Sequence, residues 1–160
     1  MPYRNRSSGF TLIELMVTVA VLAIIVAFAT PSFQTVIENN RLATESNRLF
    51  SAMSFARSEA VRVGDEVSLS AKTGGFDVGW CVHLGAACAS PDTVRQFDGG
   101  PVDYTAAANT LTFNARGEMT NAAFQVSIDP SNCDTGAVDK RRTISVSPSG
   151  RASIEKGNCP

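Results

Sequence analysis

The feature that most constrains this chain is an uninterrupted run of uncharged residues near its N-terminus. After Glu14 the next charged residue is Glu38, so 23 residues in succession carry no charge. Of the 24 residues at positions 10–33, 18 are apolar. A helix of 24 residues extends roughly 36 Å, which is enough to cross a bilayer core of about 30 Å. The run therefore predicts a membrane-spanning helix at residues 10–33.

Three other interpretations of the run stay open at this point. A buried core helix would rarely be this long and this free of charge. A conventional signal peptide is the second, because Ala27-Phe28-Ala29 resembles a signal-peptidase cleavage site. However, the run is long for a signal peptide, and the charge of Glu14 is unfavourable near its start. The third is a plain membrane anchor without processing. Because Arg4 and Arg6 precede the run, the positive-inside rule predicts that the rest of the chain is exported.

The chain as a whole has the length and composition of an ordinary single domain. The 160 residues carry a formal net charge of −1, and 44% of them are hydrophobic. These values exclude a disordered or collagen-like chain, and they give no overall basic field of the kind that attracts nucleic acid. Charged residues amount to only 18%, because the uncharged run contributes none.

Beyond Pro31 the apolar residues recur at intervals of three and four, the period of an amphipathic helix. Pro31 lacks a backbone donor and predicts a kink or an interruption. We expect the helix to occupy residues 34–63 and to stop at Gly64-Asp65. Its expected apolar stripe comprises Leu42, Ser46, Leu49, Met53, Ala56, Ala60 and Val63, with Phe50 beside it. The opposite side carries charges at ion-pair spacing, namely Glu38, Arg41, Glu45, Arg48, Glu59 and Arg62.

From residue 64 onward, short strand-like segments alternate with turn residues. The expected strands are 66–72, 79–84, 93–97, 110–114, 123–129, 142–147 and 152–155. Segments rich in glycine, proline, serine and aspartate separate them, which predicts an antiparallel sheet. The apolar stripe of the helix would cover one face of this sheet. The sequence thus predicts an α+β fold, with a long N-terminal helix and a β-rich domain at residues 64–160.

Four cysteines lie in the part of the chain that would be exported. None forms a C-x-x-C pair and His83 alone could complement them, so we expect no metal site. An oxidising compartment favours disulfides, and four cysteines allow three pairings. We favour Cys81–Cys88, a local link near a turn, together with Cys133–Cys159, which would hold the C-terminus.

No pattern in the sequence is typical of an enzyme. His83 is the single histidine, and no nucleophile motif, phosphate-binding glycine loop or metal-ligand cluster accompanies it. A lone histidine on a strand is usually structural or lies at the surface. We therefore expect neither catalytic activity nor a cofactor.

Glu14 would be the single ionised group at the start of the predicted membrane segment, and it needs a partner there. The free N-terminal ammonium of a neighbouring subunit would suit, provided that the chain is cleaved between Gly9 and Phe10. Gly9-Phe10-Thr11-Leu12-Ile13-Glu14-Leu15 resembles the class III leader and N-terminus of type IV pilins and pseudopilins. The resemblance implies a leader at residues 1–9, cleavage between Gly9 and Phe10 by a prepilin peptidase, N-methylation of Phe10, and a role for Glu14 in assembly.

Further segments resemble a narrower group within that family. Residues 37–42, 55–62, 111–117 and 144–151 are similar to the FimT/FimU-type minor pilins and to the related H-type pseudopilin, or GspH-like, domain. The resemblance implies the type IV pilin fold and a structural, non-enzymatic subunit near the tip of a type IV pilus, acting in assembly, twitching motility and adhesion. Pro31 matches a proline of major pilins that secretion pseudopilins often lack, which favours a pilus.

The same resemblance implies the partners and the location. The expected partners are other minor pilins, the major pilin, the prepilin peptidase and the inner-membrane assembly platform. The chain would be a single-pass inner-membrane protein with a periplasmic domain before assembly, and part of an extracellular pilus afterwards. An H-type pseudopilin of a type II secretion system is one alternative.

A DNA-binding minor pilin for natural transformation is the other alternative. Lys140, Arg141, Arg142 and Arg151 are its candidate residues, because cations near the C-terminus could neutralise phosphates. Some FimT-type pilins bind DNA through a G-R-x-R motif, but Gly150-Arg151-Ala152-Ser153 lacks the second arginine. Asp139 and Glu155 dilute the positive field further. The simpler interpretation is a solvated turn that contacts a neighbouring subunit.

Overall fold

The structure is a computed structural model that describes residues 10–85, 87–88 and 91–160, without the side chains of residues 28–32. The predicted leader at residues 1–9, including Gly9, lies outside the described residues. The chain divides into two compact units, one ending at Ile37 and the other comprising Glu38–Pro160. Each unit is described by itself below.

Helix α1 spans Leu12–Val63. It begins after Thr11, whose Oγ1 accepts a hydrogen bond from the backbone N–H of Glu14 at 3.2 Å, as at a helix N-cap. It ends before Gly64, which adopts a φ of +73° and donates its N–H to Ala60 O at 3.0 Å. Pro31 lies within α1, so the helix does not end there.

The predicted membrane-spanning segment at residues 10–33 is not confirmed by the structure. In the part of the chain that the structure describes, no helix combines the length and the apolar character needed to cross a membrane.

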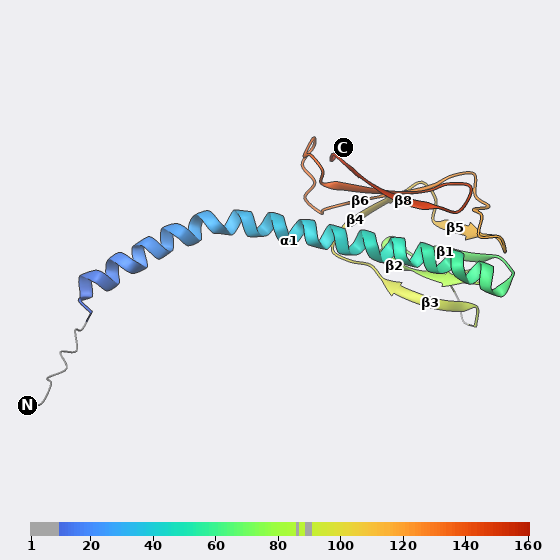
Figure 1. Ribbon diagram of the computed structural model, residues 1–160, viewed down its shortest axis with the longest axis horizontal. Coiled ribbons are helices and arrows are strands. Elements are labelled where there is room, and N and C mark those ends of the chain that lie inside the picture. Colours follow the sequence, from blue (N-terminus) through green and yellow to red (C-terminus); the bar gives the residue numbers. More distant parts are fainter. Residues whose placement is uncertain (1–9, 86, 89–90) are drawn as a thin grey trace, which may run out of the picture. The chain divides into compact units, whose positions relative to one another are not determined.

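In the described part of the second unit, eight strands form two antiparallel sheets (Figure 1). One sheet has the order β3-β2-β1-β5, and the other has the order β4-β6-β7-β8. In the first sheet the strands are β1 (Val67–Lys72), β2 (Gly75–His83), β3 (Thr93–Asp98) and β5 (Thr110–Phe113). In the second they are β4 (Asp103–Ala106), β6 (Phe124–Asp129), β7 (Arg141–Val146) and β8 (Ala152–Gly157).

The strand predictions need three corrections. The expectation of a single sheet with one covered face is wrong, because the strands form two sheets. Strand β4 was not predicted, since a segment of only four residues is too short to stand out by its pattern, and it is held by its pairing with β6. In addition, β2 begins at Gly75, within a predicted turn, because Lys72 pairs with Gly75 across a tight hairpin.

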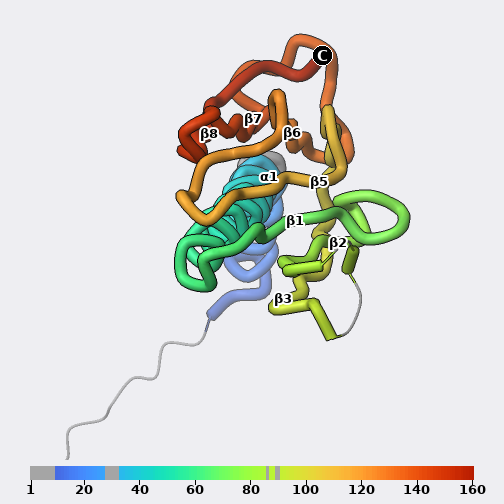
Figure 2. Tube along the Cα trace, turned by 90° about the vertical axis from the view of Figure 1, so that its right-hand side faces the viewer, coloured from blue at the N-terminus to red at the C-terminus, as the bar shows by residue number. Residues whose placement is uncertain are grey.

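The core of the second unit lies where its portion of α1 packs between the two sheets (Figure 2). The predicted helical stripe is buried, with Leu42, Leu49, Met53, Ala56 and Ala60 all at most 1% exposed. Both sheets supply the opposing side chains. These include Val67, Leu69, Trp80, Leu111 and Phe113 from the first sheet, and Phe124, Val126, Ile128 and Ile144 from the second.

Because two sheets flank the helix, its buried arc is wider than one stripe. Ala52, Glu45 and Glu59 are also buried, although the two glutamates were expected on the polar side of the helix. These two carboxylates therefore need specific partners inside the second unit.

Candidate functional site

The N-terminal part of the first unit exposes a dense set of apolar side chains. Phe10 is 79% exposed, and the large hydrophobic residues from Leu12 to Val26 are each at least 50% exposed. Apolar surface of this density on a helix is typical of a segment that packs against lipid or other helices. Glu14 is the acidic residue in the first turn of this helix, where a carboxylate also opposes the positive end of the helix dipole.

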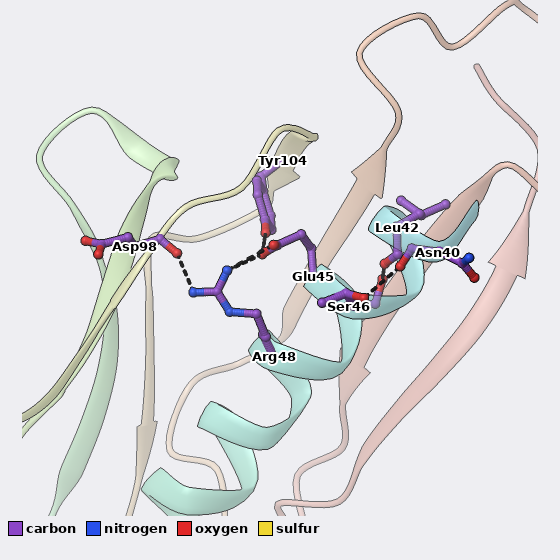
Figure 3. Close-up of polar contacts among 8 residues, drawn as sticks. Asn40, Leu42, Glu45, Ser46, Arg48, Asp98 and Tyr104 are labelled. Atoms are coloured by element: carbon purple, nitrogen blue, oxygen red, sulfur yellow. Dashed lines mark hydrogen bonds and ion pairs between the residues drawn. The ribbon is translucent and has the colours of Figure 1, made fainter. Parts of the chain in front are cut away.

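A polar cluster around the buried carboxylate of Glu45 joins α1 to the end of β3 and to β4 (Figure 3). Glu45 forms an ion pair with Arg48 at 2.9 Å and accepts a hydrogen bond from the hydroxyl of Tyr104 at 3.3 Å. Arg48 also donates to the backbone carbonyl of Asp98 at 2.9 Å. A Cβ on Gly100 would lie 2.3 Å from the Glu45 carboxyl carbon, so the loop after β3 approaches this carboxylate closely.

The electrostatics of this cluster follow from burial. Burial raises the pKa of Tyr104 above its ordinary value, and the neighbouring Glu45 carboxylate adds to the rise. Arg48 also lies 5.7 Å from the ring centroid of Trp80, which is within cation–π range. The cluster fixes the position of the helix and shows no arrangement of a nucleophile with a base.

A second ion pair lies near the end of α1. Arg62 donates its Nε to Glu59 at 2.8 Å and pairs with the same carboxylate through Nη2. The hydrogen bond from Arg62 is the main cause that lowers the pKa of Glu59. Thus two of the three predicted i,i+3 pairs form, Glu45–Arg48 and Glu59–Arg62, while Glu38 pairs with Lys140 at 3.7 Å instead of Arg41.

Arg57 connects α1 to two turns that are far apart in the sequence. Its Nε donates to Gly117 O at 2.9 Å, and its Nη2 donates to Ser149 O at 3.0 Å. Gly117 and Gly150 both have positive φ, and a Cβ on Gly150 would lie 1.9 Å from Gly117 O. The three sequence segments at 55–62, 111–117 and 144–151 therefore converge on one arginine.

A groove of about 520 Å³ lies beside this junction, and we call it the Arg57 groove. Its lining is mostly apolar, with Arg57 and Arg151 as its charged residues. The full set of lining residues is Phe50, Met53, Ser54, Arg57, Ser58, Val61, Phe113, Gly150, Arg151 and Ala152. Sequence reasoning did not identify this groove, because it forms only when α1 meets the turn between β7 and β8.

Both disulfides of the favoured pairing are present. Cys81–Cys88 spans 7 residues and Cys133–Cys159 spans 26. Cys81, His83 and Cys88 have ligand atoms within 4.8 Å of one another, but both sulfurs are occupied by their disulfide. His83 is buried, its Nδ1 donates to Gly85 O at 2.7 Å, and its Nε2 is 2.9 Å from Ser70 Oγ.

The structure separates the four candidate DNA-binding residues. Arg141 forms a two-pronged ion pair with Asp129, with its Nε at 2.8 Å, and Lys140 contacts Glu38. Arg142 donates to the backbone carbonyls of Asp139 and Arg141. Arg151 lies at the other end of the hairpin, because Arg141 pairs with Gly157 and Val146 pairs with Ala152. Two of the four charges are thus neutralised, and the fourth is apart from the rest.

Comparisons with known proteins place these features in a family. The family model of the type II transport protein GspH matches residues 45–150, and that of the prokaryotic N-terminal methylation motif matches residues 4–30. A comparison with curated proteins found no match.

Solved structures show the same fold. The type IV minor pilin FimU of Pseudomonas aeruginosa is 26% identical with a TM-score of 0.63, over 74% of this chain and 90% of that one. A second crystal form of FimU is 25% identical with a TM-score of 0.61, over 71% and 92%. The minor pseudopilin EpsH of the Vibrio cholerae type 2 secretion system is 12% identical with a TM-score of 0.52, over 72% and 97%, and it supports the fold alone.

Proposed function

Because the chain belongs to the GspH family of minor pilins and pseudopilins, we propose that it is a structural subunit of a type IV pilus. In this proposal it acts near the pilus tip in assembly, and so in twitching motility and adhesion. The observation that carries the proposal is the methylation motif at residues 4–30 followed by a head with the FimU fold. Relatives of this kind are structural subunits, not enzymes.

The proposal assigns a role to each part of the chain. Residues 1–9 are the leader, and a prepilin peptidase cleaves between Gly9 and Phe10 and methylates Phe10. Residues 10–33 hold the precursor in the inner membrane as a single span and later pack in the filament core, which the run of 23 uncharged residues supports. Residues 34–63 are the amphipathic half of the helix, and residues 64–160 form the head in the periplasm and then on the pilus.

Glu14 is proposed to neutralise the terminal amine of a neighbouring subunit during assembly. It is the one charge in an otherwise uncharged apolar stretch, so its desolvation in a membrane or filament core is unfavourable without a partner. The partners in this step are other minor pilins and the major pilin, brought together at the assembly platform.

The experiment that tests this role replaces Glu14 with alanine in the full chain. We expect normal cleavage and methylation, because Glu14 lies beyond the scissile bond, but loss of the subunit from sheared pili. Glu66→Ala is the matched control, since Glu66 is an exposed carboxylate on the second unit. Normal incorporation of the Glu14→Ala variant would contradict the role of Glu14. An intact mass that shows cleavage after Ala29 would contradict the whole proposal.

A type II secretion pseudopilin is the second candidate function, favoured by the GspH match and by the shared fold with EpsH. A deletion strain distinguishes the two functions, because loss of twitching indicates a pilus and loss of secretion indicates the secretion system. The ion pairs of Arg141 and Lys140 weigh against DNA binding by the head. A salt series of DNA affinity would detect such binding as a steep decrease in affinity with rising salt concentration.

A further inference from the structure

The Arg57 groove carries positive charge that no carboxylate in the described part of the chain offsets. Arg57 donates to the backbone carbonyls of Gly117 and Ser149. Arg151 is exposed, and its guanidinium has no hydrogen bond or ion pair to a described residue. Among the described residues that line the groove, none is acidic. Both guanidinium groups are therefore available to a carboxylate from another molecule.

The same groove offers an apolar surface. Phe50, Met53 and Phe113 line it, and Val61 lies in its wall with 55% of its surface exposed. Met53 and Phe113 also belong to the hydrophobic core of the second unit, so the groove extends that core to the surface. An apolar side chain that entered the groove would be removed from water by contacts with this core.

The open edge of strand β8 lies at the same place. In the sheet order β4-β6-β7-β8, β8 pairs with β7 on one side and with no described strand on the other. Figure 2 shows β8 on the outer side of its sheet. Ala152, the first residue of β8, lines the Arg57 groove. The groove therefore continues into a strand edge at which a further strand can pair.

The pairing register identifies the backbone groups on this edge. Ser147 donates its N–H to Arg151 O at 2.9 Å across the turn between β7 and β8, and the two strands then pair without a register shift. Bonded and non-bonded residue pairs alternate in an antiparallel ladder. Ala152, Ile154 and Lys156 therefore direct their N–H and C=O groups away from β7, toward the open edge.

These groups favour a peptide over a nucleic acid or an anionic lipid. A phosphate could meet Arg57 and Arg151, but it offers hydrogen-bond acceptors alone, and it would leave the C=O groups of the β8 edge without donors. A peptide backbone supplies both donors and acceptors in the spacing of a strand. Its side chains can supply an apolar group for the groove and a carboxylate for the arginines.

We propose that the Arg57 groove and the open edge of β8 together bind an extended segment of a neighbouring pilin that is a different protein from this chain. The segment adds a strand to β8, one of its apolar side chains enters the groove, and one of its carboxylates pairs with Arg151. This contact rests on the proposed function for the identity of the neighbour, because a minor subunit near the pilus tip has other pilins beside it.

The test uses the full chain in cells that assemble pili, with Ser54 or Lys156 replaced by the photo-crosslinking residue benzoylphenylalanine. Ser54 lines the groove and Lys156 lies toward the far end of β8, and both are exposed. In pili sheared after irradiation, we expect each position to form an adduct with the same neighbouring pilin. Mass spectrometry should place both crosslinks within about ten residues of each other, because β8 has six residues and a strand paired with it has a similar length.

Arg151→Glu should lower the yield of the Ser54 adduct roughly tenfold, because it reverses the charge that meets the carboxylate. Changing that carboxylate residue of the neighbour to lysine should restore the yield in the Arg151→Glu chain. Arg95→Glu is the matched control, since it makes the same charge change at an exposed arginine of β3, an edge strand of the other sheet. Its yield should equal that of the parent chain.

An adduct with a second copy of this chain, with nucleic acid or with lipid would overturn the proposal. So would crosslinks in unrelated segments, a yield insensitive to Arg151→Glu, or the lack of any adduct in pili that contain the chain. If the chain is present in those pili with a processed N-terminus, the proposed function stands and this contact alone fails. Absence of the parent chain from sheared pili would instead contradict the proposed function, and the contact with it.

Discussion

At the scale of single residues, the contact between Arg57 and two turns depends on glycine at position 150. The backbone there has a φ of +76°, and the Gly117 carbonyl occupies the space into which a Cβ would project. Gly64 has a similar φ of +73°, but a Cβ added there would meet no atom within 4 Å. The two glycines therefore separate the cost of the backbone conformation from the cost of crowding.

We expect Gly64→Ala to lower the free energy of unfolding by about 1 kcal/mol, the cost of a left-handed conformation. Gly150→Ala should lower it by about 3 kcal/mol, since the Gly117 turn and Arg57 must also move. Urea unfolding of the two variants and the parent chain measures both values. Equal decreases in the free energy of unfolding would show that the Gly117 turn can move away from the added Cβ without a measurable loss of stability.

The partly buried hydroxyl of Tyr104 makes stability depend on pH in the alkaline range. Its pKa is raised in the folded state, whereas in the unfolded state it titrates near 10. As the pH rises past about 10, the unfolded state ionises first, so the stabilisation present below that pH is progressively lost. If the chain is cleaved after Gly9 as proposed, Tyr3 is removed, and the absorbance of tyrosinate in the processed chain reports Tyr104 alone.

We expect this absorbance to appear at higher pH in the folded chain than in the same chain in denaturant. Tyr104→Phe should remove the tyrosine contribution to the alkaline loss of stability. A folded titration that coincides with the denatured one would mean that the hydroxyl is not sequestered beside Glu45.

At the scale of secondary structure elements, the periodicity of apolar residues predicted the features that depend on short-range sequence. The helical stripe from Leu42 to Ala60, the C-terminal stop at Gly64 and seven of the strands follow from spacing and turn residues. The burial of Glu45 and Glu59 did not follow, because it results from a second sheet packing on the other side of α1. Strand β4 and the Arg57 groove likewise depend on contacts between residues far apart in the sequence.

The two disulfides constrain their elements to different degrees. Cys133–Cys159 closes a loop of 26 residues and Cys81–Cys88 a loop of 7, and in the chain-entropy model these closures contribute about 3 and about 2 kcal/mol. Replacing each pair by alanine should therefore lower the melting temperature more for Cys133 and Cys159. The reverse order would show that the packing of the buried Cys81 outweighs loop closure.

At the scale of the whole molecule, the chain joins two units of opposite character. Among its described side chains, the first exposes apolar groups at residues 10–27 and 33–37, and the second encloses its own core. The mean hydropathy of +0.02 averages over this division. The membrane and filament contacts of the proposed function belong to the first unit, whereas folding energy comes from the second, since the buried hydrophobic residues begin at Leu42.

This division predicts that residues 38–160 fold without the rest of the chain. Every buried hydrophobic side chain among the described residues, and both disulfides, lie within that segment. We expect a soluble fragment with cooperative thermal unfolding, measured by circular dichroism, and with no free thiols. A fragment that begins at Leu49 is the control, because it loses Leu42 and the Glu45–Arg48 pair. Loss of one buried leucine alone costs about 3 kcal/mol or more, so the control should melt at a much lower temperature. If the longer fragment unfolds without cooperativity, the helix before Glu38 contributes to the stability of the head.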